Sequence, residues 1–276
     1  MTVCEKAYAK INLFLDVTGR REDGFHNIVS LMQSVSLCDE ITLTAVRSDK
    51  TEIDIRSSDK TLEVNENNLI YKSAAKYLSF FDFSADIKID LEKRIPIGAG
   101  LGGGSSDAAA TLRAMNKIFG FATEDQLLRM ASEIGSDVSF CLVGGSAVCT
   151  GRGEIVTPHK LNIDKDIVIS IGNSRVSTPK AYSLLDEKFG DFSRHNEENA
   201  PLNPDAPVCY NIFESVINND EIQKIKEIIA ENNASVTLMS GSGPSVFGIF
   251  ENEDSAKSAK EELIQNGFSA YLCKTV

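Results

Sequence analysis

The sequence predicts a protein of mixed α/β and α+β class that is built from two domains. Its 276 residues are more than one average domain needs. Segments with the alternation typical of strands are interspersed with segments of helical spacing. The pattern of predicted elements changes after Thr157-Pro158. We therefore expect an N-terminal domain over residues 1–158 and a C-terminal domain over residues 159–276, with an active site in the cleft between them.

The first predicted strand carries two polar side chains on one face. Over residues 11–17 the apolar residues alternate, so Lys10 and Asn12 share the opposite face. A turn at 20–26 follows, and residues 28–37 read as a helix or a buried strand. Later elements of this half are predicted as strands at 40–46, 52–56, 86–91, 140–143 and 146–150, and as helices within 65–81, at 107–119 and from Thr123 to Gly135.

The second half predicts a small sheet with helices on one face. A loop rich in proline and asparagine spans 192–210. The other elements are predicted as strands at 167–171, 235–239, 245–250 and 270–276, and as helices at 178–185, 220–231 and 254–265.

Composition and charge exclude several classes of protein. The chain is 42% hydrophobic and 25% charged, as expected for a globular protein with a sizeable core. Its 28 basic and 40 acidic residues give a net charge of −12, which argues against nucleic-acid or anionic-membrane binding. A phosphorylated substrate would then need local groups of opposite sign. Arg20 and Arg21 are candidates, or they are simply solvated.

The cysteines and the N-terminus predict a soluble, cytoplasmic protein. Six cysteines are scattered without a Cys-x-x-Cys pair, which suits reduced thiols. The N-terminus has no basic start followed by an apolar stretch, and no apolar run approaches the roughly 20 residues of a membrane span.

A glycine-rich loop between a strand and a helix is the strongest local signal. Its five glycines let backbone N–H groups turn inward, and the following helix adds its positive N-terminal end. Such a loop suits a di- or triphosphate, with serine hydroxyls as further donors; a flexible loop or tight turn is the alternative. The predicted cradle comprises Pro96, Ile97, Gly98, Ala99, Gly100, Leu101, Gly102, Gly103, Gly104, Ser105 and Ser106.

Three common nucleotide-binding signatures fit this loop poorly. No Gly-Lys-Ser or Gly-Lys-Thr is present, and the His-Arg-Asp and Asp-Phe-Gly motifs of protein kinases are absent. The dinucleotide-binding pattern matches at Gly98, Gly100 and Gly103, but Glu124 lies in a helix start rather than at a strand end. An NAD-dependent dehydrogenase therefore remains only as an alternative of a different class.

Three motifs resemble those of the GHMP kinases, a superfamily that phosphorylates small alcohols and phosphates with ATP. The glycine-rich loop is similar to the second motif of that superfamily. Lys10-Ile-Asn-Leu13 resembles the first motif and the segment 239–247 the third. Gly241-Ser-Gly-Pro244 within it either approaches the substrate, steadies the phosphate loop, or forms a tight hairpin turn.

The details resemble one branch of the superfamily, which acts on a cytidylylated methylerythritol in non-mevalonate isoprenoid synthesis. The pieces that carry this resemblance follow the family order over nearly the whole chain. They are Ala7–Leu13, Gly19–His26, Gly102–Ala108, Gly135–Asp137 and Asn211–Glu214.

The resemblance implies that Lys10 and Asp137 form the catalytic pair. An aspartate can take or orient a hydroxyl proton, and a nearby lysine offsets charge on the moving phosphoryl group. Taken alone, the residues favour simpler interpretations: Asp137 as a helix cap and Lys10 as a solvated strand residue.

The resemblance also implies a set of substrate contacts. Asn12 would position the hydroxyl group, Phe25 would stack on the cytosine, and His26 would hydrogen-bond its polar edge. Tyr182, with Thr178 one helical turn before it, would close the aromatic sandwich. The family usually has Tyr at the position of Phe25, so a phenolic hydrogen bond is lost here.

The sequence thus predicts an enzyme, an ATP-dependent small-molecule kinase. The resemblance implies ATP and Mg²⁺ as cofactors and leaves the protein ligands of the metal open. The cytidylylated alcohol is the expected partner, without nucleic acid or membrane, in a monomer or homodimer. The alternatives are a GHMP kinase for a sugar, homoserine or a mevalonate-type alcohol, and a non-catalytic protein that retains the fold.

Overall fold

The computed structural model describes residues 1–161, 164–190, 192 and 208–276. The chain divides into two compact units that alternate along the sequence. The first unit comprises 1–9, 37–97 and 102–143, and the second comprises 10–36, 98–101 and 144–276. The units alternate because two long strands, β1 (Thr2–Arg20) and β2 (His26–Arg47), contribute residues to both. The single boundary expected near residue 158 stays a prediction.

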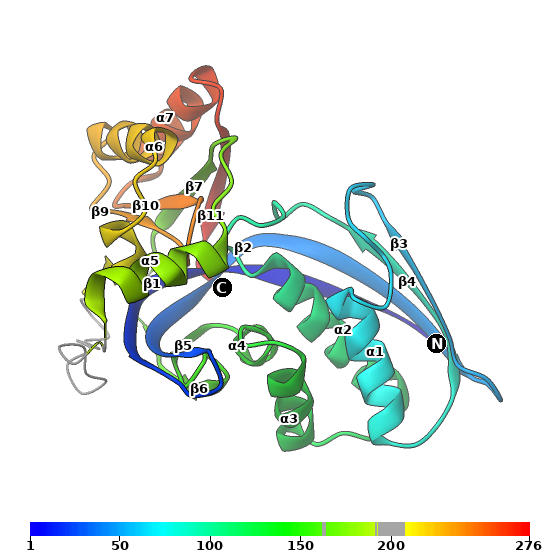
Figure 1. Cartoon of the computed structure of the whole chain (residues 1–276). Helices are drawn as coiled ribbons and strands as arrows, with labels where there is room; N and C mark the ends of the chain where they lie inside the picture. The colour runs from blue at the N-terminus through cyan, green and yellow to red at the C-terminus, as the bar shows by residue number, and fades with distance from the viewer. Residues whose placement is uncertain (162–163, 191, 193–207) are drawn as a thin grey trace. The chain divides into compact units, whose positions relative to one another are not determined.

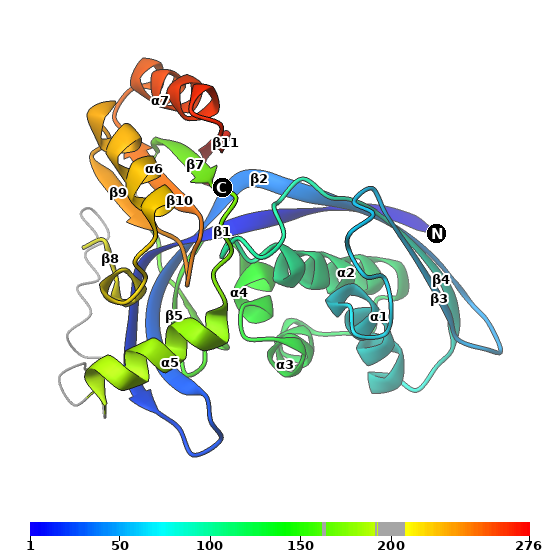
Figure 2. The ribbon, with the colours of Figure 1, turned by 45° about the horizontal axis from the view of Figure 1, so that its top comes forward.

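The first unit packs helices on one face of a sheet. Strand β4 (Ala85–Glu92) lies between β2, to which it is antiparallel, and β3 (Glu52–Ser57), to which it is parallel. Figure 2 shows the helices on the same side of these strands. They are α1 (Leu69–Phe80), α2 (Gly103–Phe119), α3 (Glu124–Ile134) and α4 (Val138–Val143).

Local capping residues set two of these helix starts. The Asn68 side chain accepts a hydrogen bond from the Ile70 N–H at 2.9 Å, so α1 begins after it. The predicted capping box of Thr123 and Gln126 is confirmed at the start of α3. Helix α2 begins at Gly103, four residues before its expected start at 107, because the end of the glycine-rich loop forms its first turn.

Two expectations for this half are corrected or resolved. The strand expected at 140–143 is wrong, since these residues belong to α4. The Val138 N–H bonds the Gly135 carbonyl at 3.1 Å and the Cys141 N–H bonds the Asp137 carbonyl at 3.0 Å, which is helical pairing. A short apolar run looks the same in a buried helix and a buried strand. Residues 28–37, left open as helix or strand, belong to β2.

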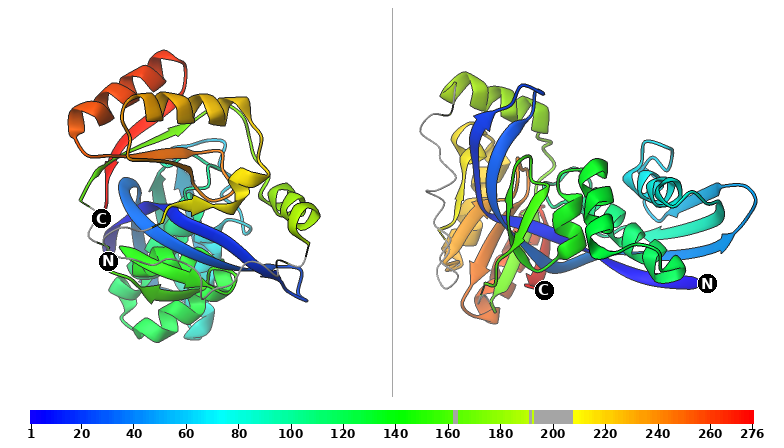
Figure 3. Two further views of the ribbon diagram at one scale, coloured as in Figure 1. Left: turned by 90° about the vertical axis from the view of Figure 1, so that its left-hand side faces the viewer. Right: turned by 90° about the horizontal axis from the view of Figure 1, so that it is seen from below.

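The second unit contains an antiparallel sheet with the order β11-β7-β10-β9. Helices α6 (Asp220–Glu231) and α7 (Glu253–Gln265) lie side by side over one face (Figure 3), which confirms the predicted arrangement. A Cβ on Gly248 would lie 2.3 Å from Ile229 Cγ2, so α6 packs directly on the β10 backbone. The strands are β7 (Asp166–Ile171), β9 (Val236–Met239), β10 (Val246–Phe250) and β11 (Ser269–Lys274).

Other elements of this unit lie around the second half of β1 and the first half of β2 (Figure 1). Strand β5 (Ser146–Thr150) pairs with β2 and with β6 (Ile155–Pro158), a strand not anticipated from the sequence. Helix α5 (Thr178–Phe189) confirms the predicted helix and extends it. A short strand, β8 (Tyr210–Asn211), leads into a 3₁₀ turn at Ile212–Ser215. Most of the loop predicted at 192–210 lies outside the described residues.

The burial of the cysteines and the lengths of the helices relate to the expectations of reduced thiols and of no membrane span. Cys141, Cys149 and Cys273 are buried, whereas Cys4 is exposed. Among the helices in the described ranges, none is both long and apolar enough to cross a membrane.

A buried cluster of charged side chains holds both ends of the glycine-rich loop. Lys93 Nζ donates to Asp39 and, at 2.8 Å, to Asp107 Oδ2 in the first turn of α2. Asp39 Oδ1 also accepts the N–H groups of Arg94 at 2.5 Å and Ile95 at 2.7 Å, immediately before the loop. The backbone on either side of the loop is therefore fixed by one ion cluster.

Burial and neighbouring charges act against each other on the pKa values of this cluster. It raises the pKa of Asp107 to about 7, against the opposing effect of Lys93 and with a further upward effect from Asp39. Burial alone would lower the pKa of Lys93, but the two carboxylates outweigh it and the net direction is upward. Asp107 Oδ1 is buried without a hydrogen-bond partner in the described structure, as suits a carboxyl group that is easily protonated.

Replacing Asp107 by Asn should change how stability depends on pH. The folded-state pKa lies above the unfolded value, so the folded protein holds a proton that the unfolded chain releases between about pH 4 and pH 7. The wild-type free energy of unfolding therefore loses this contribution as pH rises through that window, and Asp107→Asn does not. Denaturant unfolding at about pH 5 and about pH 8 should show the variant gaining relative to wild type at the higher pH.

The exposed Asp125 of α3 offers a matched control. Asp125→Asn should keep the wild-type pH dependence. A wild-type profile in Asp107→Asn as well would contradict the assignment of the proton to this cluster.

Candidate active site

The predicted catalytic lysine lies in a buried polar network on β1. Lys10 is only 4% exposed, and its Nζ donates to Asn12 Oδ1 at 2.8 Å. Asn12 Nδ2 donates to the Ser30 hydroxyl at 2.8 Å, and that hydroxyl donates to the Phe14 carbonyl at 2.8 Å. The burial argues against the solvated interpretation of Lys10. The hydrogen bond confirms that Lys10 and Asn12 project from the same face of the strand.

The middle of the glycine-rich loop is bound between Lys10 and the turn after β9. The Lys10 N–H donates to the Leu101 carbonyl at 2.9 Å. From the other side, the Ser245 hydroxyl donates to the Ala99 carbonyl at 2.6 Å and the Ser240 hydroxyl to the Gly100 carbonyl at 3.1 Å. Residues from all three GHMP-like motifs therefore contact one another within the second unit: Lys10 from the first, 99–101 from the second, and Ser240 and Ser245 from the third.

Glycine is required where this loop meets the turn. Gly100 has φ of +77°, and a Cβ there would lie 2.4 Å from the Ser240 carbonyl oxygen. A Cβ on Gly241 would lie 3.5 Å from Lys10 Nζ. The turn therefore steadies the loop. The same segment is also the hairpin turn between β9 and β10, so both of these interpretations of 241–244 hold.

Asn211 fixes the turn itself. Its Nδ2 donates to the carbonyls of Met239 at 2.7 Å and Gly241 at 2.8 Å, while its Oδ1 accepts the Phe213 N–H at 3.0 Å. At the start of α5, the Thr178 hydroxyl lies 2.8 Å from that of Ser242. The sequence marked Asn211 only as part of a family motif, since its partners lie far along the chain.

The backbone of the loop suits an anion. Gly98, Gly100 and Gly102 all have φ near +70°, at +71°, +77° and +69°. Helix α2 begins without a side-chain cap, so its first N–H groups are available to a phosphate. The residues present therefore fit the phosphates of ATP.

The side chains of the predicted cradle differ in their burial and in their ability to donate hydrogen bonds. Ala99 and Leu101 are buried and Ile97 is exposed, so these positions offer backbone groups rather than side-chain donors. The Ser106 hydroxyl is buried and donates to the Gly103 carbonyl at 2.8 Å, which leaves the half-buried Ser105 as the better placed hydroxyl donor.

We searched the described residues for a set of protein ligands that could hold the metal ion. Across the residues that the structure describes, no group of three or more His, Cys, Asp or Glu side chains is arranged to hold a metal ion. Mg²⁺ commonly takes one or two protein carboxylates and completes its shell with water and substrate phosphates.

Asp137 lies in the first unit, at the N-terminal end of α4. It is half-buried, and its carbonyl accepts the Cys141 N–H at 3.0 Å. This place suits either a helix-capping residue or a carboxylate presented at a helix terminus. Because Lys10 belongs to the second unit, the pairing of Lys10 with Asp137 stays a prediction.

The residues predicted to bind the base fall into two groups. His26 is buried, and its ring stacks on Tyr182 with centroids 4.7 Å apart. Phe25 is 52% exposed, and the Arg152 guanidinium lies 5.1 Å from the centre of its ring. The structure brings Tyr182 to His26 rather than to Phe25, so the aromatic sandwich stays a prediction.

Two side chains near the base-binding residues were not identified from the sequence. Asp186 Oδ1 lies 2.7 Å from His26 Nε2, and Arg152 lies over Phe25. Neither residue stands in a recognisable motif. Only the spacing of Asp186, one helical turn after Tyr182, could have indicated that both face the same neighbour.

The two arginines considered as local positive groups both lie beside carboxylates. Arg21 pairs with Asp23 at 3.1 Å, and Arg20 Nη1 lies 3.9 Å from Asp186 Oδ2. Asp23 is exposed, and its pKa is lowered chiefly by the Phe25 N–H and further by Arg21. These arginines thus partly cancel nearby negative charge.

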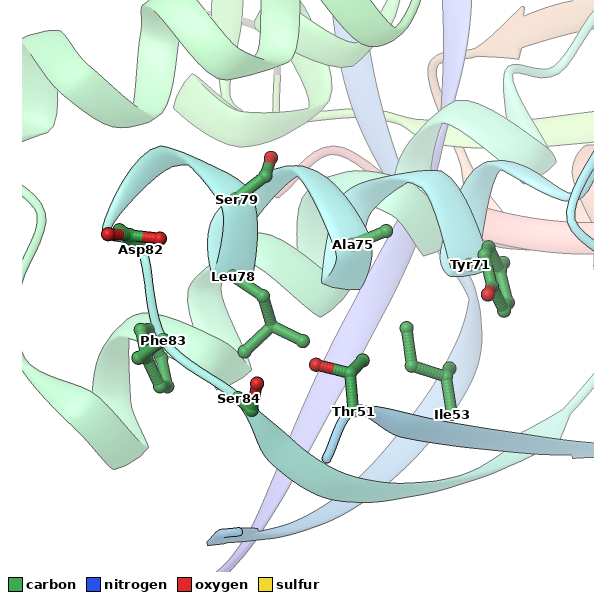
Figure 4. Close-up of a pocket in the computed structure, with 9 residues that line it drawn as sticks. All are labelled: Thr51, Ile53, Tyr71, Ala75, Leu78, Ser79, Asp82, Phe83 and Ser84. Carbon is green, nitrogen blue, oxygen red and sulfur yellow. The ribbon is translucent and has the colours of Figure 1, made fainter. Parts of the chain in front are cut away.

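A separate pocket lies in the first unit, between α1 and the β3–β4 edge (Figure 4). Its volume is about 290 Å³, at the lower end for small-molecule sites. Its walls include Thr51, Ile53, Tyr71, Leu78 and Phe83. None of the predicted site residues lines it.

Family models match both halves of the chain. The model described as GHMP kinases N terminal domain matches residues 68–145, and the model described as GHMP kinases C terminal matches 184–270. These matches confirm the predicted GHMP-kinase-like fold.

Curated relatives and solved structures extend the similarity to nearly the full length. A 4-diphosphocytidyl-2-C-methyl-D-erythritol kinase from Caldicellulosiruptor saccharolyticus is 39% identical over 94% of this chain and 91% of its own. The kinase of that name from Clostridium acetobutylicum is 36% identical over 98% and 99% of the two chains.

Among solved structures, the crystal structure of a 4-(cytidine 5'-diphospho)-2C-methyl-D-erythritol kinase matches with a TM-score of 0.82 and 32% identity, covering 99% of each chain. The Methanococcus jannaschii mevalonate kinase, at 15% identity and a TM-score of 0.71, covers 100% of this chain and 98% of its own and shares the fold. The chain belongs to the 4-diphosphocytidyl-2-C-methyl-D-erythritol kinase family of the GHMP kinases.

Proposed function

We propose that this chain transfers the γ-phosphoryl group of ATP to the 2-hydroxyl of 4-diphosphocytidyl-2-C-methyl-D-erythritol, in the non-mevalonate route to isoprenoid precursors. The observation that carries the proposal is the buried Lys10–Asn12 pair beside the glycine-rich loop, in a chain of this kinase family. Other GHMP kinases share the fold at low identity, and that likeness supports no second substrate.

Lys10 and Asn12 supply the chemistry at the acceptor hydroxyl. Asn12 holds Lys10 Nζ through a 2.8 Å hydrogen bond, so the ammonium group points from a fixed position on β1. There it offsets the charge on the transferring phosphoryl group, and Asp137 takes or orients the proton of the attacking hydroxyl. The new P–O bond forms at that oxygen as the bond to ADP breaks.

The loop 96–106 binds the phosphates through its backbone. The uncapped start of α2 and the glycines at positive φ present N–H groups to an anion. The Mg²⁺ that accompanies ATP would neutralise the charge that develops during transfer.

His26, Phe25 and Tyr182 bind the cytosine, with Thr178 beside them on α5. His26 hydrogen-bonds the polar edge of the base, and the exposed Phe25 ring offers a stacking surface. We also propose a cytoplasmic enzyme that acts as a monomer or homodimer.

Phosphorus NMR tests the activity directly. Purified protein with ATP, Mg²⁺ and the cytidylylated methylerythritol should give a new phosphomonoester signal together with ADP. Mevalonate and homoserine in place of that alcohol should give none. The absence of a phosphomonoester signal at high enzyme concentration would sink the proposal.

Substituting Gly100 should damage nucleotide binding far more than substituting Gly98. Both have positive φ, but only a Cβ on Gly100 meets backbone, at 2.4 Å from the Ser240 oxygen, whereas Gly98 has no atom within 4 Å of its built Cβ. Gly100→Ala displaces the loop, so kcat/KM for ATP should fall about a hundredfold. Gly98→Ala should stay within about tenfold of wild type, the cost of left-handed backbone strain alone. Equal losses in steady-state assays of the two variants would argue against this account of the loop.

Asp137→Asn should separate chemistry from binding. The amide keeps the size of the side chain but cannot accept a proton, so kcat should fall by about a hundredfold or more. Because ATP is held by the loop, its dissociation constant measured by titration calorimetry should stay near the wild-type value. Unchanged turnover would show that Asp137 is not the base.

A further inference from the structure

The imidazole of His26 is held on several sides. Its Nε2 lies 2.7 Å from Asp186 Oδ1, and its face stacks on Tyr182 at 4.7 Å with an interplanar angle of 24°. The ring of Phe192 meets it edge-on at 5.8 Å and 81°. The His26 side chain is only 7% exposed. The ring therefore has little freedom to rotate or flip.

Helix α5 contributes the Tyr182 and Asp186 contacts to His26 from one face. Thr178, Tyr182 and Asp186 are spaced four residues apart and so lie along one face of the helix. At one end of this face, the Thr178 hydroxyl lies 2.8 Å from the Ser242 hydroxyl. The Phe213 ring packs edge-on against Tyr182, with ring centroids 4.9 Å apart. Arg20 is the described cation beside Asp186, at 3.9 Å.

The carboxylate determines which nitrogen of the neutral ring carries the proton. An ionised aspartate can only accept hydrogen bonds, so His26 Nε2 must be the N–H donor. The other nitrogen, Nδ1, is then an acceptor. Nδ1 makes no hydrogen bond to any residue in the described ranges and so is available to a ligand.

This acceptor distinguishes two pyrimidines. The exocyclic group at position 4 of cytosine is an amine, a donor, whereas uracil has a carbonyl there, an acceptor. An imidazole nitrogen that can only accept would bond the cytosine amine and repel the uracil oxygen. Leaving a buried polar group unpaired is what makes such discrimination strong.

We propose that Asp186 is a positioning residue that fixes His26 in the Nε2–H tautomer and thereby makes the substrate site select cytosine over uracil. The inference rests on the proposed function, because it takes His26 as the residue that meets the base. Asp186 acts through His26 and needs no contact with the substrate.

The tautomer can be measured without any assay of activity. The chain has three histidines, so loss of one set of signals in His26→Gln assigns the His26 ring in nitrogen-15 NMR. We expect the neutral ring to carry its proton on Nε2 and none on Nδ1. In Asp186→Ala the spectrum should shift toward a mixture of the two tautomers. A wild-type ring protonated on Nδ1 alone would overturn the inference.

Substrate selectivity gives the functional test. Cytidine- and uridine-diphosphate-linked methylerythritol are compared as substrates of wild type, Asp186→Ala and Asp186→Asn. The ratio of their kcat/KM values should fall by about tenfold in both variants, while the KM for ATP stays unchanged. Asp186→Glu should restore part of the selectivity, which loss of folding alone would not predict.

The exposed Glu187 provides the matched control, since Glu187→Ala removes the same charge from the next position of the helix. It should keep the wild-type ratio. If Asp186→Ala is active and its selectivity ratio is unchanged, the inference about Asp186 is overturned but the proposed function is not. If the wild type phosphorylates neither substrate, the proposed function fails, and the selectivity inference fails with it whatever the NMR result.

Discussion

The backbone of Gly100 lies against the Ser240 carbonyl with no room for a side chain between them, and the arrangement of the glycine-rich loop depends on this contact. A built Cβ would stand 2.4 Å from that oxygen. The close approach lets the hydroxyls of Ser240 and Ser245 reach the loop carbonyls, while Lys10 binds the same loop through its N–H. Lys10, the loop and the turn are thereby held in fixed geometry, which is what the proposed catalysis by positioning and charge requires.

The net charge of the protein bears on how the proposed site would attract its substrates. With a net charge of −12, the molecule as a whole repels anionic substrates. Several cations near the motifs are engaged by carboxylates: Lys93 by Asp39 and Asp107, Arg21 by Asp23. In the proposed function, attraction of the two polyphosphate substrates therefore falls to backbone N–H groups, a helix terminus and Lys10. These groups act only at short range, so the proposed function needs no basic surface.

Much of the local structure could be predicted because its causes lie within a few residues. Asn68 and the Thr123–Gln126 box mark helix starts by bonding N–H groups two or three positions away. Alternation along 11–17 correctly placed Lys10 and Asn12 on one face. The same reasoning failed at 140–143, where four apolar residues carry no period long enough to separate helix from strand. It also missed that Gly103 already belongs to α2, since glycine is a poor helix former.

The sequence by itself determined the motifs, their order and the family, because each motif is a contiguous run whose chemistry is local. The tertiary structure alone decided which distant groups became partners. Lys93 meets Asp39 across 54 positions, Ser245 meets Ala99 across 146, and His26 meets Asp186 across 160. Periodicity and capping describe a residue's neighbours along the chain, whereas these pairings depend on where the chain returns after folding. The ionisation of a buried charge is set by those returning groups, so it could not be deduced before the fold was known.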